Sequence, residues 1–179
     1  PNTAQALPKI EQEGKVYTFK IQPGIYFTDD PAFKGKRREL TAQDYIYSIQ
    51  RVSDPKNHSP TYSFIDGKIQ GLEQVVANAK KTGKFNYDAP ISGLKALDKY
   101  TLQFTLTRAD YNFPYILAYV TFSGTAREVV EFYGDRIGQH PVGTGAYQLS
   151  KYVPRSKIEM VANPDYRGFI WNYKSTETA

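Results

Sequence analysis

Cysteine is absent from this sequence of 179 residues, and histidine occurs only twice, as His58 and His140. The absence of cysteine excludes disulfide bonds, thiolate metal ligands and cysteine nucleophiles. Two histidines are too few for a histidine-rich metal centre, and no acidic residues have the spacing of a calcium-binding loop. Apolar runs are short as well, and none approaches the roughly 18 residues that a membrane-spanning helix requires. The sequence therefore predicts no metal site, no cofactor and no membrane-spanning helix.

Motifs of catalysis and of nucleotide binding are missing too. The chain contains no Gly-Lys-Ser/Thr, no G-x-S-x-G and no H-E-x-x-H. Its one glycine-rich turn, Gly143-Thr144-Gly145, precedes a predicted strand instead of a helix, so it indicates a tight turn and not a phosphate site. His58 lies in a polar turn, where exposure is expected. His140 is the better candidate for a site, but a structural or solvated role is favoured, and we expect no enzyme.

Aromatic residues and positive charge are the two things that the sequence has in excess. Aromatic residues make up 15% of the chain, and the formal net charge is +5. Tyrosine suits surfaces that bind varied partners, but a tyrosine-rich core and sheet surface is the favoured interpretation. Two basic clusters, at 34–38 and 80–84, suit phosphate contacts, yet the signature of an RNA-binding module is missing. Solvated faces are therefore expected for both clusters.

Periodicity in the sequence predicts a mixture of strands and helices. Alternating apolar residues predict strands over 16–21, 94–97, 101–106, 146–153 and 157–161. Apolar spacings of three and four predict helices over 41–53 and 71–82, and proline and capping signals predict shorter ones over 114–119 and 125–132. Thr41 with Asp44, and Thr125 with Glu128, match the capping pattern of a helix start. This order predicts an α+β fold, with a mixed, largely antiparallel sheet and packed helices.

Six short segments follow one another in an informative order. They are GKVYTFKIQPGIYF at 14–27, LTAQDYIYS at 40–48, ALDKYTL at 96–102, FPY at 113–115, PVGTGAYQL at 141–149 and NPDY at 163–166. Together they resemble the family-5 extracellular solute-binding proteins, the oligopeptide- and dipeptide-binding components of ABC importers. Two features depart from that family. Ala146 stands where proline is usual, and the loop 29–38 is longer than usual, which suggests a subfamily whose ligand need not be a peptide.

The resemblance implies a two-lobed periplasmic binding protein that is longer than this chain. Residues 1–179 are then an incomplete first lobe, in which 25–140 form an inserted subdomain and 1–24 and 141–179 belong to the main lobe. Such a protein closes on a peptide or similar small solute by hinge motion and delivers it to a membrane permease. The chain alone is expected to bind solute weakly or not at all, because the second lobe supplies half of the contacts. It is also expected to be a monomer.

The resemblance further implies an exported protein, periplasmic or extracellular and possibly lipid-anchored, whose signal sequence lies outside this chain. It places candidate ligand contacts after the short proline-containing helix, at Tyr119, Thr121, Phe122 and Ser123. Gly143, Thr144 and Gly145 are interpreted as the turn that returns the chain to the main lobe. Two alternatives stay open. One is a basic nucleic-acid or surface-interaction domain, and the less favoured one is a Ser/Thr hydrolase with His58 or His140 as its base.

Overall fold

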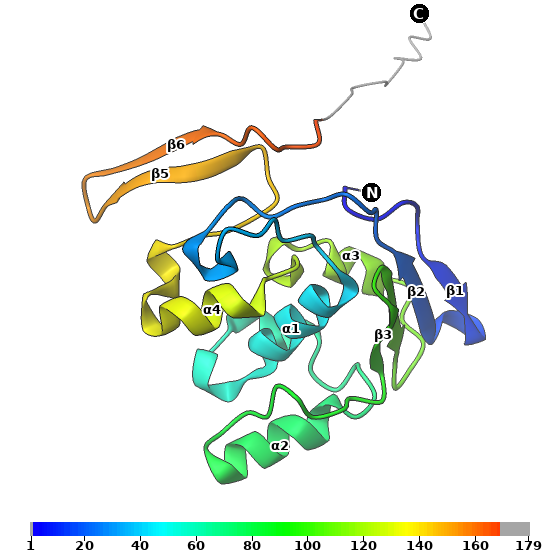
Figure 1. The fold of residues 1–179 in the computed structure, drawn as a ribbon. Helices are drawn as coiled ribbons and strands as arrows, with labels where there is room; N and C mark the ends of the chain where they lie inside the picture. Colours follow the sequence, from blue (N-terminus) through cyan, green and yellow to red (C-terminus); the bar gives the residue numbers. More distant parts are fainter. Residues whose placement is uncertain (1, 169–179) are drawn as a thin grey trace, which may run out of the picture.

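The computed structural model describes residues 2–168, which form an α+β body and a separate hairpin (Figure 1). The strands are β1 (Lys9–Glu11), β2 (Val16–Lys20), β3 (Leu94–Asp98), β4 (Thr101–Thr105), β5 (Tyr147–Val153) and β6 (Lys157–Ala162). The helices are α1 (Ala42–Ser53), α2 (Leu72–Thr82), α3 (Phe113–Leu117) and α4 (Arg127–Tyr133). Short 3-10 turns connect several of them. Between residues 2 and 168, no helix is long and apolar enough to cross a membrane.

Every predicted strand and helix is present, and most bounds shift by a single residue. The predicted cap of α1 is confirmed, since the Thr41 backbone N–H donates to the Asp44 carboxylate at 2.7 Å. The predicted Thr125 cap of α4 is wrong, because the capping residue is Ala126. Glu128 does not reach back to Thr125, since its carboxylate is bound by Arg38 instead. The strand β1 was not predicted, because its three residues carry one apolar side chain.

Four strands form an antiparallel sheet in the order β1-β2-β4-β3. The register places Tyr17 opposite Phe104 and Phe19 opposite Leu102. Across β3 and β4, Leu94 lies opposite Phe104. Because side chains alternate along a strand, these apolar residues all lie on one face of the sheet. That face is covered by the helices, with α1 beside it (Figure 1).

One hydrophobic core lies between the sheet and the helices. Three aromatic rings form its centre: Tyr17 of β2, Phe104 of β4 and Phe113 of α3. The Phe113 ring centroid lies 5.6 Å from that of Tyr17 and 5.1 Å from that of Phe104. The Tyr17 hydroxyl donates to the backbone carbonyl of Asp110 at 2.8 Å, so this buried polar group is satisfied. The expectation of a tyrosine in the core is confirmed at this position.

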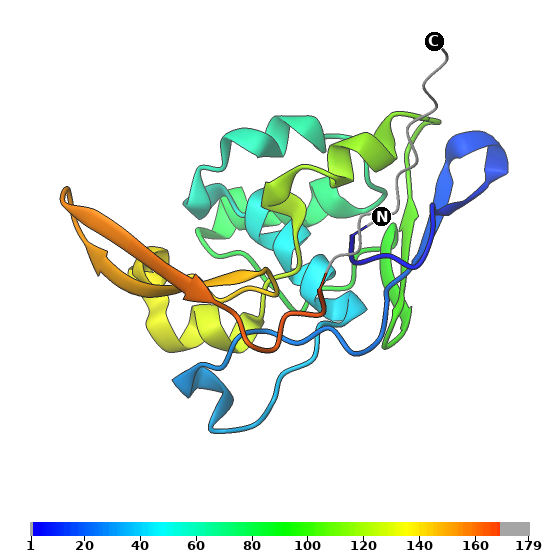
Figure 2. The ribbon, with the colours of Figure 1, turned by 90° about the horizontal axis from the view of Figure 1, so that it is seen from above.

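The strands β5 and β6 form a two-stranded hairpin that projects away from the body (Figures 1 and 2). Its register places Leu149 opposite Met160 and Tyr152 opposite Ile158, with a bulge between Leu149 and Lys151. The bulge keeps the apolar residues of both strands on one side. We call this side the apolar face of the hairpin; it comprises Tyr147, Leu149, Tyr152, Ile158, Met160 and Ala162. Ile158 and Met160 are 66% and 57% exposed, so this face has no partner within the described residues.

Candidate functional site

The candidate ligand contacts lie on and around a short 3-10 turn, Val120–Phe122, directly after α3. Tyr119 precedes the turn and is 52% exposed. Thr121 and Ser123 are exposed as well, whereas Phe122 is buried in the core. The side chains of Tyr119, Thr121 and Ser123 are thus accessible to a ligand, and Phe122 anchors the segment from beneath.

Hydrogen bonds hold this segment against α1. The Ser48 hydroxyl donates to the backbone carbonyl of Ser123 at 2.5 Å and lies 2.9 Å from the Thr125 hydroxyl. The Thr125 backbone N–H donates to the backbone carbonyl of Asp44 at 3.2 Å. The segment is therefore fixed at its C-terminal end by a buried helix, as a preorganised binding surface requires.

Gly124 lets this segment lie close to the body. A Cβ atom at this position would lie 2.5 Å from Leu40 Cδ1 and 3.4 Å from the Tyr45 ring. The backbone of Gly124 is not in the left-handed region, so the requirement is for space and not for conformational freedom. A side chain here would force either the Leu40 side chain or this segment to move.

Tyr119 pairs with a second exposed aromatic ring, that of Phe64. The two ring centroids are 5.6 Å apart and the planes are nearly perpendicular, at 88°. Phe64 is 42% exposed. We call Phe64 and Tyr119 the aromatic pair. Phe64 was not predicted, because it lies in a separate 3-10 turn, Pro60–Phe64, and no spacing in the sequence connects it to Tyr119.

A charge network joins the first turn of α1 to the first turn of α4 through Arg38. The Arg38 guanidinium binds the Asp44 carboxylate at 2.6 Å and the Glu128 carboxylate at 2.5 Å. Burial alone would raise the pKa of Glu128, but the hydrogen bond from Arg38, a backbone hydrogen bond and the positive charge of Arg38 together outweigh burial and hold the pKa below its ordinary value. The solvated face predicted for 34–38 is therefore wrong for Arg38, while Lys34 and Lys36 are exposed as expected.

The turn at Gly143, Thr144 and Gly145 lies where the body meets the hairpin. The Thr28 backbone N–H donates to the Gly143 carbonyl at 2.9 Å. The Asn163 side-chain amide donates to the Gly145 carbonyl at 2.8 Å. These carbonyl groups are bound by donors of the chain itself, which favours a structural connection over a ligand contact.

The two histidines have unrelated surroundings. His58 is exposed, as predicted, at the end of a 3-10 turn. His140 stacks on Tyr133 with ring centroids 3.8 Å apart, and the Tyr133 hydroxyl donates to Asp30 at 2.9 Å. A structural role for His140 fits this stacking. No group of three potential metal ligands occurs within residues 2–168.

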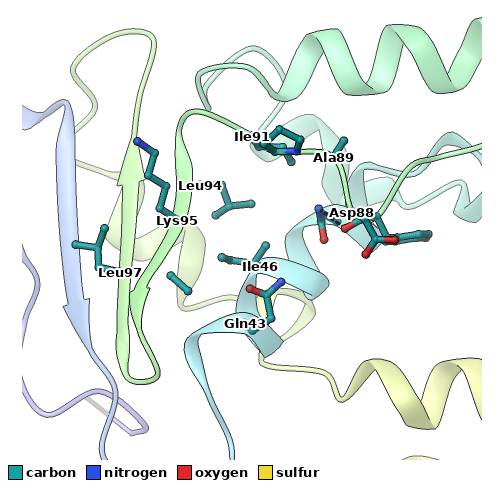
Figure 3. Close-up of a pocket in the computed structure, with 12 residues that line it drawn as sticks. Gln43, Ile46, Asp88, Ala89, Ile91, Leu94, Lys95 and Leu97 are labelled. Atoms are coloured by element: carbon teal, nitrogen blue, oxygen red, sulfur yellow. Dashed lines mark hydrogen bonds between the residues drawn. The ribbon is translucent and has the colours of Figure 1, made fainter.

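A pocket of about 560 Å³ lies away from these segments, between α1, the loop 87–91 and β3 (Figure 3). None of the predicted site residues lines it. No pattern in the sequence indicates this pocket, because its walls come from three segments that only the fold brings together.

Comparison with known proteins decides the family. The family described as bacterial extracellular solute-binding proteins, family 5 Middle, matches residues 1–176. The chain belongs to this family. Among curated relatives, the periplasmic oligopeptide-binding protein OppA of Salmonella typhimurium is 31% identical over 155 residues, which cover 85% of this chain and 26% of the relative. The dipeptide-binding protein of Escherichia coli is 28% identical over 170 residues, covering 89% of this chain and 28% of the relative.

Solved structures of similar proteins have the same fold. The structure described as Listeria monocytogenes OppA bound to peptide is 27% identical, with a TM-score of 0.73, and covers 92% of this chain and 30% of that one. An oligopeptide ABC transporter substrate-binding domain from Bacillus anthracis is 25% identical, with a TM-score of 0.73. The match covers 93% of this chain and 30% of that one. The α+β prediction is confirmed, and this chain spans less than a third of the length of these relatives.

Proposed function

We propose that the protein to which this chain belongs is the substrate-binding component of an ABC transporter. It would capture a peptide or a similar small solute and deliver it to a membrane permease. The observation that carries this proposal is the family match over residues 1–176, together with relatives named as oligopeptide- and dipeptide-binding proteins. Because those relatives include periplasmic proteins, we also propose that the protein works in the periplasm or outside the cell, free or lipid-anchored.

The chain would be an incomplete first lobe, with 25–140 as an inserted subdomain and 1–24 and 141–179 as parts of the main lobe. The apolar face of the hairpin supports the assignment of 141–179. An isolated two-stranded hairpin is marginal in water, and a third strand or a packed layer is needed for stability. The remainder of the main lobe would cover this face. The boundary at residues 24 and 25 stays a prediction, since β1 and β2 share one sheet with β3 and β4.

Ligand would lie over the accessible side chains of Tyr119, Thr121 and Ser123, with Phe64 widening the apolar surface. Exposed aromatic surface of this kind is a frequent feature of binding sites. The second lobe would close on this surface, and solute would stabilise the closed form because it contacts both lobes only there. We therefore propose weak or absent solute binding by the monomeric chain alone, and no catalytic turnover.

Titration calorimetry with a pool of tripeptides to pentapeptides tests the proposal on two proteins. These are the 179-residue chain and the full product of its open reading frame. The full product is expected to bind with a dissociation constant near 1 μM, and the chain alone no tighter than about 100 μM. Micromolar binding by the chain alone would refute the two-lobe mechanism, and failure of the full product to bind any peptide would exclude peptides as the solute.

Two substitutions in the full product test the aromatic pair. Tyr119→Ala is expected to weaken peptide binding by about tenfold, because it removes a large exposed contact. Tyr111→Ala is the matched control, since Tyr111 is similarly exposed, at 64%, but lies ahead of α3. Equal affinities of the two variants would remove Tyr119 from the proposed site.

The dependence of binding affinity on salt concentration distinguishes this proposal from the nucleic-acid alternative. Binding that depends on phosphate contacts falls steeply as ionic strength rises, whereas closure around a neutral solute changes little. The calorimetric titration is therefore repeated at low and at high salt. A steep loss of affinity would favour the nucleic-acid domain.

A further inference from the structure

The loop 29–38 is anchored in the body at three points. The Asp30 carboxylate accepts a hydrogen bond from the Tyr133 hydroxyl of α4 at 2.9 Å. The Phe33 side chain is buried in the hydrophobic core. At the end of the loop, Arg38 takes part in the charge network that joins α1 and α4. These contacts fix the position of the loop against the body.

From this anchored loop, Arg37 reaches the base of the hairpin. Its guanidinium lies 3.2 Å from the carboxylate of Asp165, just beyond the end of β6. The same guanidinium lies over the Tyr26 ring, 4.1 Å from the ring centroid. The ring attracts the cation and restricts its orientation, so Arg37 is held where it can bind the carboxylate.

A backbone hydrogen bond joins the body and the hairpin at another point. The Thr28 backbone N–H donates to the Gly143 carbonyl at 2.9 Å, where the chain leaves the body for the hairpin. A bond at this one point fixes where the hairpin begins but not the direction in which it projects. The contact between Arg37 and Asp165 supplies a second point, and two points restrict that direction.

Arg167 makes a separate connection at the hairpin base. Its guanidinium donates to the Thr144 carbonyl at 3.1 Å and also bonds the side chain of Asn2. This contact joins the hairpin base to the N-terminal segment and not to the loop 29–38. Loss of the Arg37 contact is therefore expected to loosen the hairpin without releasing it.

The arginines of the loop differ in their contacts from its lysines. Within residues 2–168, Arg37 and Arg38 form ion pairs, whereas Lys34 and Lys36 form none. Both lysines are exposed. The basic residues that connect the loop to other elements are thus the two arginines, one on the body side and one on the hairpin side.

We propose that the loop 29–38 is a strap that sets the direction of the β5–β6 hairpin relative to the body, with Arg37 as the residue that holds the hairpin. The unusual length of the loop then serves this connection and is not a sign of an unusual ligand. The strap depends on an exposed ion pair, so it weakens as the ionic strength rises. It does not rest on the proposed transport function.

Distances between two spin labels test the strap in the 179-residue chain. Because the chain has no cysteine, labels attach only at introduced ones, Ser156→Cys in the hairpin turn and Lys81→Cys on α2. Both positions are exposed. Double electron–electron resonance gives the distribution of distances between the labels, and one main distance is expected. Arg37→Ala is expected to raise the population outside that main distance about fivefold, the upper range for an exposed ion pair.

Further variants assign the effect to one contact. Asp165→Ala removes the carboxylate but keeps the backbone N–H that donates to Asn163, and is expected to give the same rise as Arg37→Ala. The double variant is expected to exceed neither single variant, because both remove the same contact. Lys36→Ala is the matched control on the same loop and is expected to leave the distribution unchanged. Sodium chloride at about 1 M is expected to reproduce part of the rise.

Three results would overturn the strap. One is an unchanged distribution in both Arg37→Ala and Asp165→Ala, since the backbone bond from Thr28 and the Arg167 contacts would then suffice. Another is an equal rise in Lys36→Ala, which would point to the charge of the loop and not to one contact. The third is a broad distribution without a main distance in the chain that carries only the labels.

Discussion

The body and the hairpin use the same sequence pattern with opposite results. In β2 and β4 the alternating apolar residues, such as Tyr17 and Phe104, are fully buried under the helices. In β5 and β6 the same alternation leaves Ile158 and Met160 more than half exposed. Alternation therefore identifies a strand and its apolar face, but burial depends on whether another layer covers that face.

The body and the hairpin also differ in the contacts that hold them in place. The sheet of the body is bonded strand to strand, and its core is continuous with four helices. The hairpin has its own ladder and is held to the body by polar contacts near its base, such as the ion pair between Arg37 and Asp165 at 3.2 Å. Exposed ion pairs contribute about 0–1 kcal/mol, so the hairpin is expected to be the less stable region.

The largest expected effect is in the body. Phe104→Ala removes a ring that packs against both Phe113 and Phe19, and is expected to cost about 3–5 kcal/mol of unfolding free energy. Urea denaturation followed by circular dichroism measures it. Should this variant fail to fold, Phe104→Leu is expected to cost about 1 kcal/mol. Tyr152→Ala in the hairpin is the control, and an equal cost there would remove the distinction between the two regions.

A smaller effect comes from the pH dependence of the charge network. The folded-state pKa of Glu128 lies below its ordinary value, so its contribution to stability is full above about pH 5. That contribution is lost as the pH falls through the folded-state pKa, because the unfolded chain then binds the proton more readily. Glu128→Gln is therefore expected to reduce the loss of stability between pH 6 and pH 3, by less than about 1 kcal/mol.

Glu131→Gln serves as the control for the pH experiment. Glu131 lies on the same helix and pairs with Arg127, but it is 60% exposed. Unfolding free energies from urea titrations at each pH measure both variants. If Glu131→Gln flattens the pH profile as much as Glu128→Gln does, the contribution assigned to the Arg38 network is wrong.

The smallest expected effect is in the hairpin. Met160→Lys places a charge on its apolar face and is expected to change the unfolding free energy of the chain by less than about 0.5 kcal/mol. The variant is also expected to remain a monomer, as proposed for the chain itself. Urea denaturation and sedimentation velocity check the two outcomes. A loss of more than about 2 kcal/mol would show that the apolar face is packed in the chain alone.

Much of the fold could be predicted from the sequence, because its local signals agree with the final structure. The alternation over 101–106 and the capping residues Thr41 and Asp44 specify their elements without help from distant residues. The prediction that Thr125 caps α4 failed because of a contact between residues far apart in the sequence. Arg38, far away in the sequence, binds the carboxylate of Glu128 that a capping box would have used.

The candidate site was only partly accessible to sequence reasoning. The resemblance pointed to Tyr119, Thr121, Phe122 and Ser123, and the fold exposes three of these and buries Phe122. Phe64 could not be predicted, because its contact with Tyr119 joins two turns that are distant in the sequence. The pocket between α1 and β3 was missed for the same reason.

The sequence by itself determined which segments form strands and helices, which face of each is apolar, and the family to which the chain belongs. These properties depend on residue type and spacing along a few turns or strands. Only the tertiary structure decided which apolar faces are covered and which carboxylates Arg38 binds. Those outcomes depend on contacts between residues far apart in the chain, and local periodicity carries no information about such contacts.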